Sequence, residues 1–178
     1  MNVHVTNIYG FSPNSVTLLS QMEVRNVGRI FGYNELAVYR YDNSEEPWNE
    51  LNSRYDGIIA RVSHGDIVFF QSPTWNSVEW DNGLVDKLKA YGCRIVMFIQ
   101  DVPPLMFESN YYLMPKFISM YNKAEVIVVP SEKMYLKLVE EGLTVEKYVV
   151  QKMWDFTVDQ SLYLSLIHIS EPTRLGMI

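Results

Sequence analysis

Six short apolar runs recur along this chain of 178 residues, and longer segments of mixed polarity separate them. Runs such as "GDIVFFQS" and "CRIVMFIQ" each contain an unbroken apolar stretch, which is typical of strands buried on both faces of a parallel sheet. The segments between them have the lengths of helices. Strands that alternate with helices predict right-handed crossover units, and therefore an α/β, Rossmann-like parallel sheet with helices on both faces.

We expect strands at 2–9, 34–41, 65–72, 93–100 and 124–130, and a sixth strand followed by a turn within 147–155. Helices are expected at 13–31, 50–62, 79–91 and 114–122, and a last one, capped by Ser131, that runs to Glu141. Ser12 or Asn14 is expected to cap the first helix, with Pro13 in its first turn. We expect the apolar face of this helix to consist approximately of Val16, Leu19, Met22, Val27 and Ile30. Pro103 and Pro104 are expected to keep the segment 101–110 from being helical.

The helix at 79–91 has the clearest amphipathic pattern. We expect its buried face to consist of Trp80, Leu84, Leu88 and Tyr91. Glu79 and Asp81 are expected to be solvated in its first turn, where negative charge suits the helix dipole. Gly92 is a suitable residue to end the helix.

The charge and the reactive residues exclude several classes of function. The net charge of −6 and the lack of a Lys/Arg cluster argue against a nucleic-acid partner. Cys93, the one cysteine, is expected to be a buried structural thiol, and His64 a turn residue. No spacing suggests a metal site, and no cofactor is expected. With neither a signal-peptide pattern nor an apolar run of about 20 residues, we expect a cytoplasmic protein without a transmembrane segment.

Polar and aromatic residues follow the strands, where parallel sheets bind ligands. The segments are "YGFSPNS", "QSPTWN", "QDVPPLMFESNYY" and "PSEK". Hydroxyls and amides bind neutral hydroxyl groups, and aromatic rings stack on a sugar or a base, so a carbohydrate or nucleotide-sugar cleft is indicated. Three of these segments also have a structural interpretation. "YGFSPNS" would be a turn with a capping serine, and "QSPTWN" a rigid turn with Trp75 over the core. Asp101 would be either a general base or a turn residue.

Four blocks of this sequence resemble one family of bacterial sugar transferases, the glucosyltransferase-3-like and β-1,6-galactofuranosyltransferase group. They are "VTNIYG", "RYDGIIARVSHGDIVFFQSPTWN", "VMFIQDVPPLMFESNYYLM" and "VPSEKMYLKLVEEGL". The resemblance covers residues 1–160 or so. It implies a GT-B enzyme with two Rossmann-like domains, in which residues 1–155 form the N-terminal, acceptor-side domain and residues 156–163 begin the interdomain segment.

The resemblance also implies an activity and a set of site residues. The full-length enzyme would transfer a hexosyl group from a UDP-sugar, with glucose or galactofuranose, to a glycan or glycoprotein such as a serine-rich repeat adhesin, and would be a homo-oligomer. Asp101 would be a catalytic base if the reaction inverts the anomeric configuration, although Gln100 precedes it where many relatives are expected to have histidine. The substrate-binding residues would be Ser12, Asn14, Ser15, Thr17, Gln71, Ser72, Thr74, Trp75, Asn76, Phe107, Asn110 and Tyr111.

The C-terminal residues 164–178 follow neither period. "LSLIHISEPTR" resembles the translation of a sequencing adapter, so we expect this tail to be an artefact and the chain alone to be inactive. A non-catalytic sugar-binding module, or a partner subunit of a glycosyltransferase complex, is the alternative. A flavodoxin-like or response-regulator-like domain is disfavoured, because no acidic pair follows the first strand.

Overall fold

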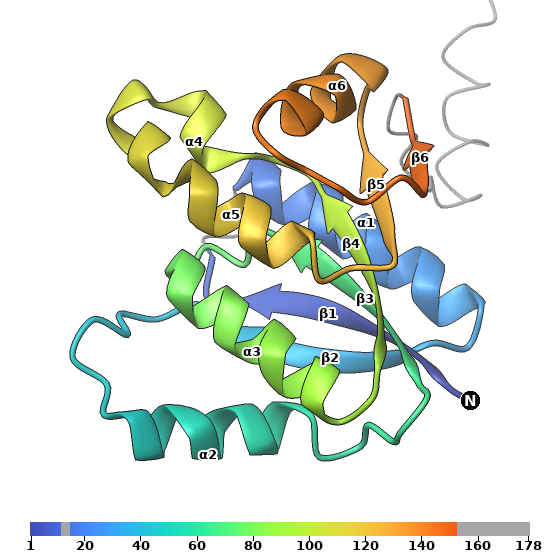
Figure 1. The fold of residues 1–178 in the computed structure, drawn as a ribbon. Helices are drawn as coiled ribbons and strands as arrows, with labels where there is room; N and C mark the ends of the chain where they lie inside the picture. Colours follow the sequence, from blue (N-terminus) through green and yellow to red (C-terminus); the bar gives the residue numbers. More distant parts are fainter. Residues whose placement is uncertain (12–14, 153–178) are drawn as a thin grey trace, which may run out of the picture.

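The computed structural model describes residues 1–11 and 15–152, without the side chains of residues 16–18. Six parallel strands form one sheet in the order β2-β1-β3-β4-β5-β6 (Figure 1). The strands are β1 (Val3–Tyr9), β2 (Asn34–Tyr39), β3 (Ile67–Ser72), β4 (Arg94–Ile99), β5 (Val126–Val129) and β6 (Tyr148–Val150). The parallel, Rossmann-like α/β arrangement that the alternating pattern predicts is therefore confirmed.

The helices connect successive strands. They are α1 (Val16–Ile30), α2 (Trp48–Ile58), α3 (Val78–Ala90), α4 (Pro103–Met106), α5 (Met114–Tyr121) and α6 (Glu132–Glu140), with a 3-10 helix, η1 (Glu108–Leu113), between α4 and α5. In Figure 1, α2, α3 and α5 lie in front of the sheet and α1 lies behind it. The carboxyl end of β1 points to the left of this view, where the loop after β2 and α4 also lie.

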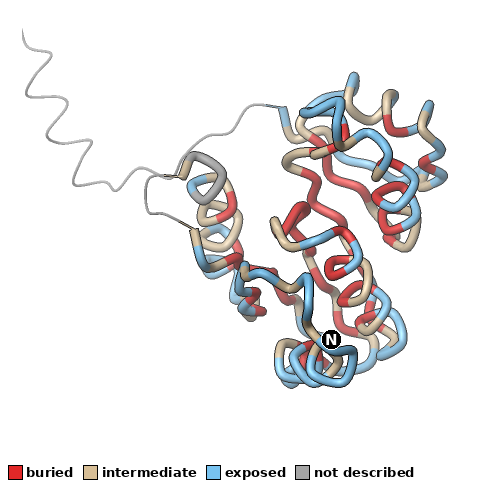
Figure 2. Tube along the Cα trace, turned by 90° about the vertical axis from the view of Figure 1, so that its left-hand side faces the viewer, coloured by how far each residue is buried: buried red, intermediate tan, exposed pale blue. Residues whose placement is uncertain are grey.

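The main core lies between the sheet and helices α2, α3 and α5. Alternate residues of β4, Ile95, Met97 and Ile99, are fully buried against this layer, as are Trp80 and Leu88 of α3. Figure 2 shows the buried segments in the middle of the molecule and the exposed ones around them. Cys93 is buried and free, as the sequence predicts.

The prediction that Pro103 and Pro104 exclude a helix is wrong. Helix α4 begins at Pro103, and both prolines stand in its first turn. Proline has no amide hydrogen and a φ already suited to a helix, and first-turn amides lack intrahelical partners in any case. The two prolines therefore start a short helix here.

Helix α1 presents a different face to the sheet from the predicted one. Leu19, Val27 and Ile30 are exposed, whereas Gln21 and Gly28 are buried. A Cβ atom on Gly28 would lie 3.2 Å from a methyl group of Val5, so the glycine allows close approach of the helix to β1. The apolar periodicity of α1 therefore does not mark its inner face.

The two predicted caps of α1, Ser12 and Asn14, lie outside the described residues. Ser15 occupies the N-cap position, and its side chain makes no capping hydrogen bond. The region at and beyond residue 153, with the predicted domain boundary and tail, also lies outside the part of the chain that the structure describes.

Two predictions for α3 are wrong. Tyr91 is 49% exposed, because the helix ends at Ala90 and the chain turns there. Asp81 is buried, and it lies on the same face as Leu84, Val85 and Leu88 at spacings of three, four and seven. Glu79 is exposed as predicted, and it pairs with Lys116 of α5.

Two histidines lie at the amino edge of the sheet, His4 near the start of β1 and His64 in the turn before β3. His4 is buried, and its Nε2 lies 2.9 Å from Oδ2 of Asp66. The amides of Asn2 and Ser63 also donate to Asp66, and these bonds hold its pKa well below the usual range. His64 is an exposed turn residue, as predicted.

Candidate functional site

A hollow of about 570 Å³ lies at the carboxyl ends of β1, β2 and β3. The loops that follow these strands line it together, because neighbouring parallel strands end at the same edge of the sheet. The lining residues are Gly10, Arg40, Tyr41, Asp42, Asn43, Ser44, Trp75, Asn76 and Ser77. Of the residues predicted to bind substrate, Trp75 and Asn76 are in this lining.

Trp75 is held in an unusual state. Its φ is +65°, a left-handed conformation that costs a non-glycine residue on the order of 1–3 kcal/mol. Its indole Nε1 is also buried without a hydrogen-bond partner among the described residues. Both features are unfavourable, so the surrounding loop must hold this side chain in place at the edge of the hollow.

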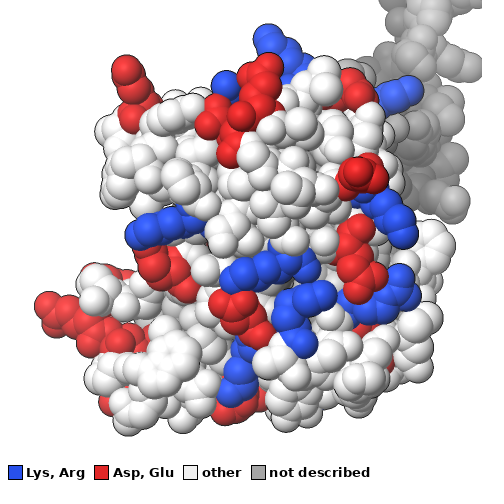
Figure 3. Space-filling model, viewed as in Figure 1, with Lys and Arg blue, Asp and Glu red and all other residues white. Residues whose placement is uncertain are grey.

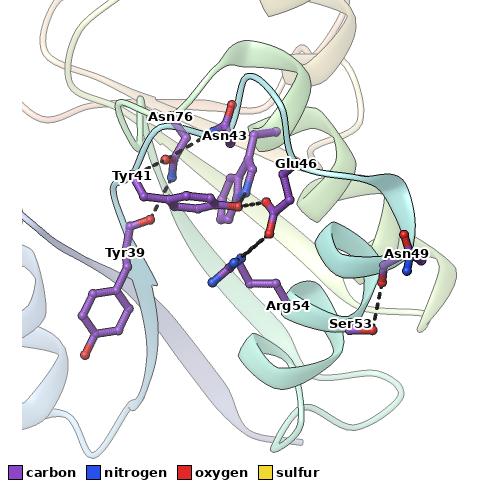
Figure 4. A network of polar contacts seen from close by, with 9 residues as sticks. Tyr39, Tyr41, Asn43, Glu46, Asn49, Ser53, Arg54 and Asn76 are labelled. Carbon is purple, nitrogen blue, oxygen red and sulfur yellow. Dashed lines mark hydrogen bonds and ion pairs between the residues drawn. The ribbon is translucent and has the colours of Figure 1, made fainter.

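Asn76 joins the loop after β3 to the loop after β2 (Figure 4). Its Nδ2 donates to the carbonyl of Tyr39 at 3.2 Å, and its Oδ1 accepts from the amide of Tyr41 at 3.2 Å. The Oδ1 also accepts from Nδ2 of Asn43, at 3.5 Å. Within its own loop, the amide of Asn76 donates to Oγ1 of Thr74 at 3.3 Å. One side chain thus fixes the two walls of the hollow to each other.

Asp81 of α3 holds this loop from below. Its carboxylate accepts the hydroxyl of Thr74 and, at 3.2 Å, the amide of Thr74. Burial raises the pKa of Asp81 to about 7, against the opposing effect of the two bonds from Thr74. Asp81 was predicted to be solvated and was not among the predicted site residues, although its spacing on the buried face of α3 is a signal that could have identified it.

Tyr41, on the wall formed by the loop after β2, is fixed by three neighbours (Figure 4). Its hydroxyl donates to Glu46 and accepts from Nε1 of Trp80 at 2.9 Å. The guanidinium of Arg54 lies 4.4 Å from the Tyr41 ring centre and donates to Glu46, with Nη2 at 2.6 Å. Burial raises the pKa of Tyr41, so it is a neutral donor at physiological pH.

Gln71, Ser72 and Thr74 are buried, and their polar groups bond within the protein. In the side chain of Gln71, Nε2 donates to the carbonyl of Thr6 at 2.6 Å, and Oε1 accepts from Nε2 of Gln100 at 2.8 Å. The Ser72 hydroxyl lies 3.3 Å from that of Tyr121. Their predicted substrate contacts stay predictions, and their burial places them beneath the hollow.

The segment after β4 forms a second, more exposed group of predicted residues. Asp101 is half-buried, and burial raises the pKa of its carboxyl group. Phe107 is 54% exposed and Tyr111 46% exposed, and the Tyr111 hydroxyl donates to Glu141 at 2.6 Å. The lining of the 570 Å³ hollow includes none of Asp101, Phe107, Asn110 and Tyr111. The structure thus separates these residues from Trp75 and Asn76.

The beginning of α1 lies near the same edge of the sheet. Ser20 donates to Oε1 of Gln100 at 3.1 Å, and Gln21 donates to the carbonyl of Pro73 at 3.1 Å. The predicted contacts of Ser15 and Thr17 stay predictions, and the side chain of Thr17 is not described. No cluster of three or more metal-ligating side chains occurs within residues 1–11 and 15–152.

Comparison with known proteins shows the family of this chain. The family model described as "Glucosyltransferase 3-like, N-terminal domain" matches residues 2–153. The chain belongs to this family. It is 48% identical over 163 residues to each of two proteins named Glucosyltransferase 3, from Streptococcus gordonii and Streptococcus parasanguinis.

In both alignments the matched region covers 92% of this chain and 49% of the relative. The chain therefore spans about half the length of the curated relatives it matches. These matches confirm the family predicted from the four sequence blocks, and the matched domain ends close to the last residue that the structure describes. No helix among residues 1–11 and 15–152 is long and apolar enough to span a membrane.

Proposed function

We propose that this chain is the acceptor-binding, N-terminal half of a GT-B sugar transferase that moves a hexosyl group from a UDP-sugar to a glycan. The observation that carries the proposal is the 570 Å³ hollow, walled by Trp75 and Asn76, in a glucosyltransferase 3-like domain. An indole ring stacks on the apolar face of a sugar, and amides bind its hydroxyls. UDP-glucose is the donor we favour, because both relatives are named glucosyltransferases.

The preformed walls suit recognition of a flexible glycan. Binding loses affinity when a protein has to order its own loops around a ligand. Here Asp81, Thr74 and Asn76 hold the loop before a ligand arrives, through the hydrogen bonds described above. Gln71, Ser72 and Thr74 would therefore position Trp75 and Asn76, which would make the direct contacts.

Asp101 would act as the catalytic base from the neighbouring loop. A base works best with a pKa close to the working pH, and burial shifts the pKa of Asp101 upward in that direction. Phe107, Asn110 and Tyr111 would contribute a second wall once an acceptor is bound. The N-terminus of α1, with Ser12, Asn14, Ser15 and Thr17, would face the donor diphosphate, because free amides at a helix start favour anions.

The remaining predictions concern the whole protein. A second Rossmann-like domain would supply most contacts to the UDP-sugar, and the complete enzyme would be a cytoplasmic homo-oligomer acting on a glycoprotein. The length of the relatives, about twice that of the matched region, supports the second domain, and the other features rest on the family resemblance. No cofactor is proposed.

A fusion protein tests the proposal. Residues 1–153 would be joined to the second half of the Streptococcus gordonii relative, and transfer from UDP-glucose to glycan acceptors would be measured. We expect transfer, and we expect Trp75→Ala and Asn76→Ala to raise the KM for the acceptor while leaving the KM for UDP-glucose unchanged. Unchanged acceptor KM values in both variants would contradict the proposed site. Acceptor binding without any transfer would favour the non-catalytic binding module.

A further inference from the structure

Further hollows lie next to the one at the sheet edge, on the outside of the molecule between α2 and α3. A second hollow of about 480 Å³ shares Asn43, Ser44 and Ser77 with the first. A third, of about 420 Å³, shares Trp48, Tyr55 and Glu79 with the second. Because each hollow shares lining residues with the next, the three are neighbours on the surface, and the second and third together are here called the α2–α3 groove.

The two hollows of the α2–α3 groove share two aromatic residues, of which Tyr55 is buried and Trp48 is exposed. Trp48 is the first residue of α2, and it is 69% exposed, although it is the largest side chain on that helix. Leu51, one turn further along α2, is partly buried and lines the second hollow with Trp48, whereas Pro47 and Asn49 beside Trp48 are exposed. An exposed indole next to an apolar side chain is suited to stacking on the apolar face of a sugar ring.

The floor of the groove is closely packed. Tyr55 is buried, and its hydroxyl donates to the carbonyl of Trp80 at 2.8 Å. A Cβ atom on Gly83 would lie 2.6 Å from that hydroxyl oxygen, so glycine at this position lets Tyr55 pack directly against α3. The groove therefore has a fixed base.

Polar side chains along the groove are held in place by interhelical bonds. Lys87 donates to Asn52 at 2.8 Å, and Lys123, in the turn after α5, donates to Asn82 at 2.5 Å. Lys87 also pairs with Asp56, and Lys123 with Asp86. Positive and negative side chains alternate across this face and form no large patch of one sign (Figure 3). Such a surface suits a neutral, hydroxyl-rich ligand better than a charged polymer.

We propose that the α2–α3 groove is an acceptor-extension subsite, in which Trp48 stacks on a sugar two or more units away from the reacting end. The inference rests on the proposed function, because the first hollow would hold the acceptor's terminal sugar. The groove follows α3, whose 13 residues span about 20 Å, so it is long enough for several sugar units. The protein would therefore prefer oligosaccharides over monosaccharides as acceptors.

The test measures binding of the 178-residue chain to immobilised oligosaccharides of glucose, galactose and N-acetylglucosamine, each one to five units long. We expect affinity to increase with length for at least one sugar series. Trp48→Ala should weaken binding of chains of three or more units by about tenfold, equivalent to about 1.4 kcal/mol, and leave monosaccharide binding unchanged. Trp48→Phe should restore part of the loss, because it keeps an aromatic ring.

Phe31→Ala is the matched control, since Phe31 is also 69% exposed and follows α1, on the other side of the sheet. It should bind every oligosaccharide as the unmodified chain does. Equal effects of Trp48→Ala on all lengths, no effect at any length, or no binding of the unmodified chain would each overturn the inference. A change in oligomeric state without a change in binding would also overturn it, because the groove would then be a contact between copies.

The proposed function and this inference can fail separately. If Trp75→Ala weakens binding at every length while Trp48→Ala has no effect, the acceptor hollow stands and the extension subsite fails. If Trp75→Ala and Asn76→Ala leave all binding unchanged, the acceptor hollow itself is wrong.

Discussion

The loops after β3 and β4 end neighbouring strands, and both were predicted from the sequence to bind the acceptor, yet they differ in construction. The loop after β3 is tied to α3 through Asp81 and to the loop after β2 through Asn76. The segment after β4 exposes Phe107, Tyr111 and Tyr112, and it is built from the short helices α4 and η1. One loop is a fixed wall, and the other presents aromatic side chains with little support.

This difference suggests a division of work. A wall that is ordered in advance contributes affinity, because little entropy is lost on binding. An exposed aromatic segment next to a half-buried carboxylate, Asp101, can adjust to the ligand and bring the carboxylate to the reacting hydroxyl. The comparison predicts that changes in the loop after β3 affect binding and stability, and that changes after β4 affect turnover.

The largest expected effect is on turnover. In the fusion enzyme, Asp101→Asn should lower kcat by about 100-fold or more, because a general base is lost. Burial raises the pKa of this base, so the acidic limb of the pH profile of kcat/KM should lie above pH 3.8, the ordinary value for the group. Glu146→Gln, at an exposed carboxylate outside the lining of the hollow, is the control and should retain turnover. Full turnover in Asp101→Asn would remove Asp101 from the mechanism.

The second effect is on stability. Asp81→Ala leaves the amide and hydroxyl of Thr74 without their acceptor, which should lower the free energy of unfolding by about 3 kcal/mol. Urea denaturation of the 178-residue chain measures it. A loss below about 0.5 kcal/mol, the level of ordinary surface substitutions, would contradict the supporting role of Asp81.

The pH dependence of stability sharpens that result. The pKa of Asp81 is raised from 3.8 to about 7, so the folded state holds this proton more tightly than the unfolded chain does. The resulting stabilisation is complete below about pH 4 and is lost as the pH rises through 7. Asp81→Asn should remove this decline, whereas Asp86→Asn, at an exposed carboxylate of the same helix, should retain it. Identical profiles for the two variants would refute the assignment.

A smaller effect compares two asparagines. Asn76→Ala removes the link between two walls and should weaken glycan binding by about tenfold. Asn110→Ala, in η1, should change binding by less than about twofold, because its segment contributes mainly to turnover. Binding to the immobilised oligosaccharides measures both. A larger loss with Asn110→Ala would reverse the division of work between the loops.

The smallest effect is dynamic. The amides of Thr74 and Asn76 donate to Asp81 and to the Thr74 hydroxyl in a mostly buried loop. They should exchange hydrogen about tenfold or more slowly than the amides of exposed Tyr111 and Tyr112, measured by NMR. Equal exchange rates in the two segments would show that the loop after β3 is not preformed.

The sequence predicted the sheet well because its strands are short, apolar and regularly separated. All six strands formed, and the central ones, such as β3 and β4, have the apolar pattern of strands buried on both faces, whereas the edge strands β2 and β6 are partly exposed. The inner face of α1 was mispredicted, because Gln21 and Gly28 face the sheet for reasons of hydrogen bonding and close approach. Apolar periodicity carries no information about either effect.

The candidate site was only partly predictable. Trp75 and Asn76 were identified from their place after a strand, and the structure places them in a hollow. Asp81 was assigned to the surface, because an acidic residue in the first turn of a helix is usually solvated. Its spacing from Leu84, Val85 and Leu88 indicates the buried face of α3, but its hydrogen bonds to Thr74, seven residues earlier, are not revealed by any local pattern. The contribution of the loop after β2 was also missed, because it depends on the strand order.

The most direct test of the preformed acceptor wall is NMR mapping of ligand binding. The 178-residue chain would be titrated with the oligosaccharide that binds best among the series described above. We predict that the largest shifts occur at the amides of residues 40–44 and 75–77 and at the Trp75 indole, while the buried Trp80 indole changes little. Shifts confined to residues 101–113, or absent from both loops that line the hollow, would contradict the account.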